Sequence, residues 1–389
     1  MVNPAIGARS VKHGLLIAKL YYLCFFGAIG CLAPFLNVFF QQRGLTGVQI
    51  GWLGSIAPLM ALVANPIWGT VADRWQIHRQ VLALCAFVAG TVTLFFLWTD
   101  GFWAFVGLVM ILTFFRTPLG GILDSTVMDL TRRVNASYGR QRLWGTVGFV
   151  IVAYGLGQLL TANDLSLVFW GHTALMGVGC VVLSFLLPVQ SVEEKRVSIG
   201  QGLRVLIGQR NYLSFLLAMI LQGMAMAGYI GFLGLQILKL GGIEQQVGIA
   251  WAFNALLEIP IMYFGVRWFA RFSYRRLILI ALLGFTLVWS LVGMSATPGQ
   301  VIIIVLGSGI CFGIFWVAAV GYVSEAAPPG LKATAQTLMG AAMSGLGWSL
   351  GSIVAGYLWD NISSHAVFLA AAGMAMSAML IFWLGGREK

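Results

Sequence analysis

The stretch at residues 299–324 reads GQVIIIVLGSGICFGIFWVAAVGYVS and contains no charged side chain. A helix needs about 20 residues to cross the hydrocarbon layer of a membrane, because each residue adds about 1.5 Å. Similar apolar stretches recur along the 389 residues, of which 59% are hydrophobic and only 9% are charged. One soluble core would not keep so much apolar surface from water, so the chain is predicted to lie in a lipid bilayer.

The apolar stretches predict helices and not strands. In lipid every backbone N–H and C=O group needs a partner within the protein, and stretches this long and uniform do not fit barrel strands. The predicted fold class is an all-α membrane protein with twelve transmembrane helices. We place these helices at residues 15–41, 47–72, 79–98, 101–130, 140–161, 165–187, 211–237, 245–268, 274–294, 299–324, 333–358 and 364–385.

One long polar connection, residues 190–210, separates the sixth helix from the seventh. The chain is therefore predicted to form two pseudo-symmetric six-helix bundles, residues 1–189 and 211–389, joined by this linker. Lys and Arg residues in the loops fall on one side of the predicted membrane, and the other side keeps only Arg43 and Lys239. Cytoplasmic loops carry the excess of basic residues, so both termini and the linker are predicted to be cytoplasmic. The net charge of +11 thus indicates topology and not nucleic-acid binding.

The sequence carries no pattern typical of an enzyme. The five cysteines lie inside apolar stretches without the paired spacing of zinc or redox motifs, so free thiols are predicted. The four histidines form no metal-ligand cluster, and no phosphate loop or nucleophile motif is present. We expect no metal and no cofactor. Two six-helix halves without a soluble domain instead predict a secondary transporter, driven by an ion gradient such as protons or by its substrate's own gradient.

The loop after the second helix reads GTVADRW at residues 69–75 and continues to Arg79. It resembles the signature loop of the major facilitator superfamily, in which a glycine permits close helix approach and an Asp with basic residues forms a cytoplasmic charge latch. The resemblance implies that Asp129, at the end of the fourth helix, partners Arg74 and that the latch stabilises the outward-facing state. Ordinary positive-inside flanks are the alternative reading. The implied latch residues are Gly69, Asp73, Arg74, Arg79 and Asp129.

A second motif combines Asp124 in the fourth helix with YGRQRLWG at residues 138–145. It resembles the oligosaccharide/proton symporters and, more closely, the phenylpropionate permease family, along nearly the whole chain. In the sugar symporters an acidic residue at the position of Asp124 and an arginine at that of Arg142 hold the substrate, and a tryptophan stacks on it. Here Phe149 takes the place of that tryptophan, which keeps a flat apolar surface but departs from the sugar-binding pattern.

Ionisable residues inside membrane helices are costly, so by default they indicate functional sites. Arg116 precedes Asp124 by eight residues, about 12 Å along the helix axis and about 80° around it, so both can line one cavity. Its guanidinium suits a carboxylate or phosphate on a substrate. Arg116 as a partner of Asp124 or a clamp on backbone carbonyls fits equally well. For Arg142, a purely structural ion pair with Asp124 or a position at the membrane interface also stays open.

Glu258, with Asn254 one turn earlier, is the clearest acidic residue of the second half. A carboxylate in a cavity of low dielectric constant can take up a proton at one membrane face and release it at the other. Phenylpropionate-type and nucleoside/proton symporters resemble this chain in carrying a glutamate here, although Val288 stands where they often have an arginine. Glu258 and Asp124 are therefore the predicted proton-coupling residues, with pure substrate binding by Glu258 as the alternative. Asn254 is predicted to bind substrate.

The sequence therefore predicts proton symport of a small organic solute, such as an organic or aromatic acid, a sugar or a nucleoside, by alternating access. We expect a monomer in the cell membrane, the inner membrane of a bacterium, with solute, protons and lipid as its partners and no nucleic acid. A proton-coupled exporter of drugs or metabolites would use the same carboxylates and stays as an alternative. A non-transporting membrane sensor is a weaker one, because Arg116, Asp124 and Glu258 would have no role in it.

Overall fold

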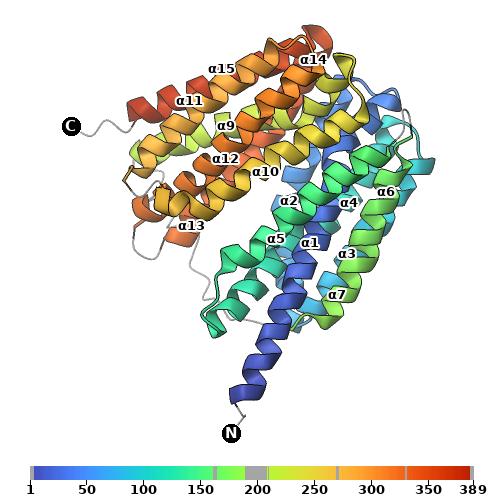
Figure 1. The fold of residues 1–389 in the computed structure, drawn as a ribbon, viewed down its shortest axis with the longest axis vertical. Coiled ribbons are helices and arrows are strands. Elements are labelled where there is room, and N and C mark those ends of the chain that lie inside the picture. The colour runs from blue at the N-terminus through green and yellow to red at the C-terminus, as the bar shows by residue number, and fades with distance from the viewer. Residues whose placement is uncertain are drawn as a thin grey trace. The chain divides into compact units, whose positions relative to one another are not determined.

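The computed structural model describes residues 4–160, 164–188, 208, 210–268, 271–328 and 331–385. These residues are almost entirely helical, and no β-strand occurs among them (Figure 1). Two compact units account for the contacts of the chain: Met1–Arg43 with Met60–Glu194, and Gly44–Leu59 with Lys195–Lys389. Most of the predicted linker at residues 190–210 lies outside the described residues.

Apart from the first helix, which begins at Pro4 and not at residue 15, the helices of the first half begin and end within a few residues of the predicted boundaries. The third span continues from a helix into a 3-10 turn, and the sixth contains a π-helical segment between two short helices. The elements are α1 (Pro4–Gln42), α2 (Gly47–Trp75), α3 (His78–Val92), η1 (Thr93–Trp98), α4 (Phe102–Arg133), α5 (Tyr138–Leu159), α6 (Ser166–His172), η2 (Thr173–Cys180) and α7 (Val181–Leu186).

The second half repeats this helical pattern, again with a π-helical segment in one span. Its elements are α9 (Arg210–Lys239), α10 (Glu244–Trp268), α11 (Tyr274–Gly293), α12 (Pro298–Ala326), α13 (Lys332–Gly340), η3 (Ala341–Gly347), α14 (Trp348–Asn361) and α15 (Ser364–Gly385). Each of the twelve predicted spans thus corresponds to a helix or to consecutive helical segments.

Eleven helical spans in the described part of the chain are long and apolar enough to cross a membrane. The twelfth predicted span, α5, has 22 residues, which at about 1.5 Å each reach the thickness of the hydrocarbon layer. Arg142, Gln158 and several glycines make it more polar than the other spans. The predicted all-α membrane fold is confirmed, and α5 is its least apolar helix.

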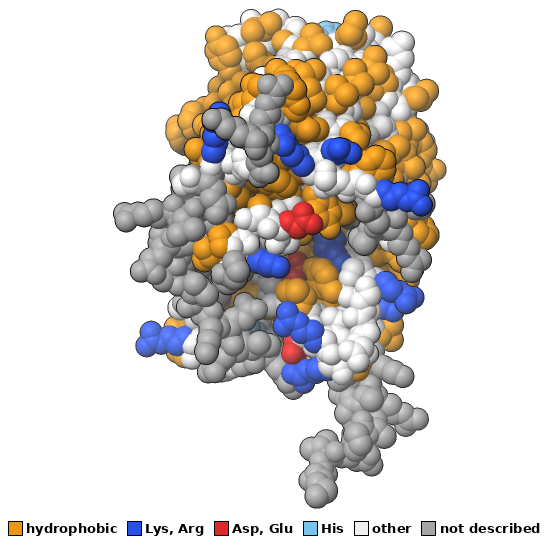
Figure 2. Space-filling view, turned by 90° about the vertical axis from the view of Figure 1, so that its left-hand side faces the viewer, with side chains coloured by type: hydrophobic (Ala, Val, Ile, Leu, Met, Phe, Trp, Pro, Cys, Tyr) orange, Lys and Arg blue, Asp and Glu red, His pale blue; other side chains and the backbone are white. Residues whose placement is uncertain are grey.

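The outer surface of the helices also fits a bilayer. Trp98 at the end of η1 is 70% exposed and Trp103 at the start of α4 is 80% exposed. Indole rings are favoured at the membrane–water interface, which explains two exposed tryptophans beside one loop. Figure 2 shows hydrophobic side chains over much of one face of the molecule, together with groups of Lys and Arg side chains.

Glycines allow several helices to pack backbone against backbone. A Cβ atom added at these glycines would collide with backbone atoms of the neighbouring helix, so only glycine fits. The pairs are Gly90 with Gly177, Gly148 with Leu23, Gly223 with Met343, and Gly351 with Met224. Both π-helical segments take part, η2 through Gly177 and η3 through Met343. These contacts fix the spacing of the helices that carry the polar residues.

The N-terminus of α2 is held by a residue far away in sequence. Asp360 of α14 accepts hydrogen bonds from the backbone N–H groups of Gly47 and Val48, each at 2.8 Å. Both partners belong to the second unit. The first N–H groups of a helix have no partner within the helix, and a carboxylate there also interacts favourably with the helix dipole.

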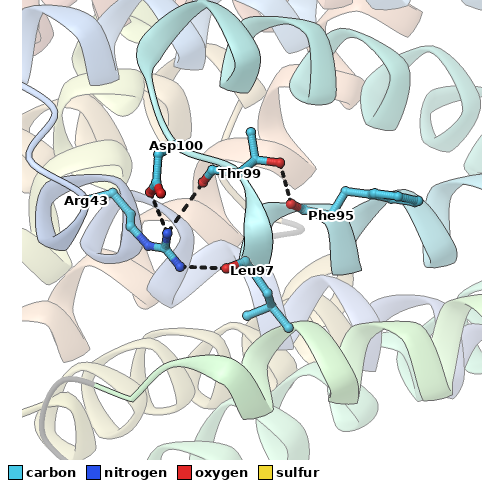
Figure 3. Close-up of polar contacts among 5 residues, drawn as sticks. All are labelled: Arg43, Phe95, Leu97, Thr99 and Asp100. Carbon is cyan, nitrogen blue, oxygen red and sulfur yellow. Dashed lines mark hydrogen bonds and ion pairs between the residues drawn. The ribbon is translucent and has the colours of Figure 1, made fainter.

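The two basic residues on the side predicted to lack positive charge both have local partners. The Arg43 guanidinium pairs with Asp100 at 2.5 Å and donates to the carbonyl oxygen of Leu97 at 2.9 Å (Figure 3). The Nζ atom of Lys239 lies 5.0 Å from the ring centroid of Trp359. The two positive charges thus interact with an anion, a carbonyl group or an aromatic face.

Candidate functional site

Asp124, half-buried on α4, is bound by two tyrosine hydroxyls from two other helices. Tyr22 of α1 is fully buried and donates a hydrogen bond to Asp124 Oδ1 at 2.5 Å. Tyr138, the first residue of α5, makes side-chain hydrogen bonds with Asp124 and with Tyr22. The position of Tyr138 follows from its neighbour Ser137, the N-cap of α5, whose hydroxyl accepts from the third backbone N–H of the helix.

Arg142 lies one turn further along α5 and stacks on aromatic rings of α1. Its guanidinium carbon is 3.8 Å from the ring centroid of Phe26 and 5.7 Å from that of Tyr22. At these distances the cation interacts favourably with the negative faces of the rings. Gly145 makes the arrangement possible, because a Cβ atom there would lie 2.6 Å from Phe26 and 3.0 Å from Arg142 Nη1.

The structure brings Asp124 and Arg142 into one cluster, but it does not pair them directly. Within the described ranges the ion pairs are Arg43 with Asp100, His78 with Asp73, and Arg133 with Asp129. Tyr22 touches both residues, the carboxylate through its hydroxyl and the guanidinium through its ring. The structural alternative of a direct interhelix ion pair is therefore wrong for this structure. The cluster comprises Tyr22, Phe26, Asp124, Tyr138 and Arg142, and we call it the tyrosine–arginine cluster.

Phe149 follows Arg142 by about two turns on α5 and is half-buried. Its backbone carbonyl packs against Gly30 of α1, where a Cβ atom would lie 2.9 Å from that oxygen. The aromatic residue predicted to support the substrate is thus fixed by the α1–α5 contact that also holds the tyrosine–arginine cluster.

Arg116 lies on the stripe of α4 that also carries the buried residues Leu112 and Leu119. It interacts electrostatically with His172 at the end of α6, and it forms no ion pair with Asp124 in the part of the chain that the structure describes. The alternative that Arg116 neutralises Asp124 is therefore wrong for this structure.

His172 is a buried polar residue that the sequence did not single out. Its side chain is fully buried, and Nδ1 lies 3.1 Å from the hydroxyl oxygen of Thr93. Its Nε2 atom has no hydrogen-bond partner among the described residues. The sequence feature that could have indicated this residue is a histidine within the apolar sixth span, at a depth in the membrane similar to that of Thr93 in the third span.

In the second unit, Asn254 and Glu258 of α10 lie at a close contact with α12. A Cβ atom at Gly309 would collide with the backbone carbonyl of Asn254, and one at Gly313 would lie 3.5 Å from that of Glu258. Both pairs are spaced by one helical turn, so the two backbones run close together along this contact. The Asn254 Oδ1 atom is buried and has no hydrogen-bond partner in the described part of the protein. Such an acceptor is costly unless water or a solute satisfies it.

Two of the predicted latch residues, Asp73 and Arg79, make contacts close to α3 and α7. Asp73 pairs with His78, with Oδ1 and Nε2 2.9 Å apart. Arg79 donates a hydrogen bond to the carbonyl oxygen of Leu187 at 3.1 Å, beyond the end of α7. A basic side chain is favourable at that helix end because the last carbonyl groups have no partner within the helix.

Two details of the implied latch differ from the structure. Asp129 pairs with Arg133 at 2.7 Å and not with Arg74, because residues four apart are neighbours on a helix surface. No heavy atom lies within 4 Å of the place where a Cβ atom of Gly69 would stand, so this glycine is not at a close helix contact here. A role of these residues in another conformation remains a prediction.

The helical spans, arranged as two units with charged groups inside membrane helices, define a multi-pass membrane transporter. The chain belongs to the MFS_1 like family, whose model matches residues 15–370. The predicted membership of the major facilitator group is thus confirmed.

Relatives with known names are transporters. Maltose permease of Geobacillus stearothermophilus is 27% identical over 95% of this chain and 93% of the permease. A probable 3-phenylpropionic acid transporter of Escherichia coli is 26% identical over 92% of this chain and 95% of its own. The crystal structure of the nucleoside transporter NupG superposes with a TM-score of 0.84 at 17% identity, covering 97% of this chain and 100% of that chain. The predictions of a transporter and not an enzyme, and of a multi-pass membrane location, are confirmed.

Proposed function

We propose that this chain couples proton movement to the transport of a small organic solute by alternating access, acting as a monomer. The observation that carries the proposal is the tyrosine–arginine cluster, in which Asp124 and Arg142 lie in membrane helices without neutralising each other directly. Charged groups placed in this way are expensive in a bilayer unless they serve a solute or an ion. The predicted binding groups are Arg116, Asp124, Arg142 and Phe149 in the first unit and Asn254 in the second.

The names of the relatives support the solute class. They mention maltose, 3-phenylpropionic acid and nucleosides, which share polar or anionic groups on a compact body. We propose a solute of one of these kinds, an organic or aromatic acid, a sugar or a nucleoside. The identity between this chain and each relative is too low to select one of them by name alone.

Proton coupling is proposed for Glu258, with Asp124 as the second candidate. Glu258 is half-buried within a membrane helix, where a carboxylate can exchange a proton as its access to water changes. The unpartnered Oδ1 atom of Asn254, one turn away, supports a solute contact beside it. We also propose that both termini and the linker are cytoplasmic and that the latch residues stabilise the outward-facing state.

The test is uptake into proteoliposomes with and without an imposed inward proton gradient, using labelled 3-phenylpropionate, maltose and uridine. We expect the gradient to accelerate uptake of at least one of them. Glu258→Gln should abolish this acceleration while preserving exchange of labelled for unlabelled solute, because exchange needs no net proton movement. Glu325→Gln, at an exposed glutamate near the end of α12, is the matched control and should behave as the unchanged protein.

The outcomes separate the alternatives. Uptake that ignores the gradient in the unchanged protein would contradict proton coupling. Movement of solute only against an opposed proton flow would indicate export. Transport of none of these solutes, nor of cationic drugs, would contradict the transport proposal itself.

A further inference from the structure

Arg142 carries a positive charge that no acidic side chain of the described residues neutralises. Asp124, the carboxylate of the same cluster, accepts hydrogen bonds from Tyr22 and Tyr138 instead. An arginine and an aspartate in one membrane cluster would ordinarily form a bidentate pair, because that pair satisfies both charges at once. The unusual feature of this site is that two tyrosine hydroxyls, and not the guanidinium of Arg142, donate to the Asp124 carboxylate.

The stacking of Arg142 determines which part of its guanidinium is left for a ligand. The guanidinium carbon of Arg142 lies over the ring of Phe26, 3.8 Å from the ring centroid, and the side chain carries five N–H donors in a planar fork. No acceptor for these N–H groups is found within hydrogen-bond distance among the described residues, and the side chain is half-buried. The edge of the guanidinium is thus available for a planar anion with two acceptor atoms.

We propose that Tyr22 and Tyr138 are specificity-determining residues, which hold Asp124 away from Arg142 so that Arg142 binds the carboxylate of a monoanionic solute. This rests on the proposed transport function and names the solute class of the same site. The single positive charge of the Arg142 guanidinium matches the single negative charge of one solute carboxylate. A phosphate group carries about −1.5 to −2 at neutral pH and would leave an excess negative charge. The ring of Phe26, which is half-buried, supplies an apolar surface for the body of the solute.

The two tyrosines act on the solute through Asp124, so their role differs from simple packing. If both hydroxyls are removed, Asp124 loses its donors and Arg142 is the nearest cation of the cluster. Pairing between Asp124 and Arg142 would then compete with the solute carboxylate. Removing the charge of Asp124 in the same variant would end this competition. The proposal therefore predicts a loss of anion binding that a second substitution reverses.

The experiment measures binding of 3-phenylpropionate and of its neutral amide, 3-phenylpropionamide, to the purified full chain in lipid nanodiscs. We expect the unchanged protein to prefer the carboxylate by about 10- to 100-fold, the range of one charge-assisted hydrogen-bonded pair. The double variant Tyr22→Phe/Tyr138→Phe should lose most of this preference, and adding Asp124→Asn should restore it. Arg142→Gln should abolish it. Tyr154→Phe and Arg140→Gln change exposed residues of the same helix and should leave the preference unchanged.

Three results would overturn the proposal. The first is a carboxylate preference that survives in the double phenylalanine variant, and the second is a failure of Asp124→Asn to restore it. The third is tight binding of maltose or uridine without binding of the carboxylate, where the substitution Asp124→Asn alone abolishes this binding. That result would show that Asp124, and not Arg142, sets the choice of solute, and it would leave the transport function intact. If the double variant does not fold, the single variant Tyr138→Phe should still lower the preference, and an unchanged preference there would also contradict the proposal.

Discussion

Arg142 depends on the absence of a side chain one turn further along its own helix. Gly145 faces both the ring of Phe26 and the Nη1 atom of Arg142, so any Cβ atom there must displace one of them. Gly155 lies on the same helix with no neighbouring atom within 4 Å of its virtual Cβ position. The two glycines thus form a matched pair, in which one shapes the site and the other does not.

We predict that Gly145→Ala lowers the affinity for the transported solute by about fivefold, the effect of losing about 1 kcal/mol of cation–ring interaction. Gly155→Ala should leave affinity unchanged and slightly raise the melting temperature, because alanine is the better helix former. Solute binding and thermal unfolding of both variants check this. Equal affinity in Gly145→Ala and the unchanged protein would mean that the stacking of Arg142 on Phe26 does not shape the binding site.

The sequence identified the charged residues of the site but not their partners. Asp124 was recognised because an ionisable group in an apolar stretch stands out, and Arg142 through the resemblance to the sugar symporters; both lie in the tyrosine–arginine cluster. The hydrogen bond from Tyr22 was not predicted, since it depends on how α1 and α4 are rotated about their axes. Asp129 illustrates the same limit. Its partner Arg133 follows from the geometry of α4 itself, whereas the implied partner Arg74 belongs to another helix, α2.

At the scale of single elements, the apolar pattern sets where helices begin and end more reliably than how regular they are. The π-helical segments η2 and η3 lie inside spans whose sequence predicts ordinary helices. Both occur where a glycine of a neighbouring helix packs against their backbone, Gly90 at η2 and Gly223 at η3. No particular residue composition marks a π-helical turn in a sequence. It follows from the packing of two helices, which the sequence of either helix alone does not contain.

The start of α2 gives a prediction at this scale. Replacing Asp360 by alanine removes two hydrogen bonds to the N-terminus of α2, and such caps contribute about 0.5–2 kcal/mol. We expect the melting temperature to fall in the order unchanged protein, Asp360→Asn, Asp360→Ala, because asparagine keeps one of the two acceptor oxygens. Thermal unfolding measures it. The neighbouring exposed residue provides the control, since Asn361→Ala should have a smaller effect than Asp360→Ala, and a reversed order would show that the cap does not stabilise α2.

At the scale of the whole molecule, the charge asymmetry gives a topology that the helices alone do not fix. Residues 299–324 and the other apolar stretches determine that the chain crosses the membrane, and this part of the fold was predicted in full. The direction of crossing comes only from Lys and Arg in the loops.

We therefore predict that a fluorescent protein fused to the C-terminus folds and fluoresces, and that alkaline phosphatase fused there is inactive, because both report the cytoplasm. A fusion of either reporter after Gly241, in the turn between α9 and α10, should give the opposite result. Activity measurements in intact bacterial cells check both positions. A phosphatase that is active at the C-terminus would reverse the assigned topology.

The hydrogen bond between Tyr22 and Asp124 can be removed by point mutations that arise easily in evolution. Changing a tyrosine codon to phenylalanine, or an aspartate codon to asparagine, takes a single nucleotide. Neither change adds volume, so neither disturbs the glycine contacts that hold α1 and α5 together. If Tyr22 and Asp124 set the solute preference as proposed, a gene encoding this site lies one or two point mutations from a descendant with a different preference for charged nutrients, reached without rebuilding the scaffold.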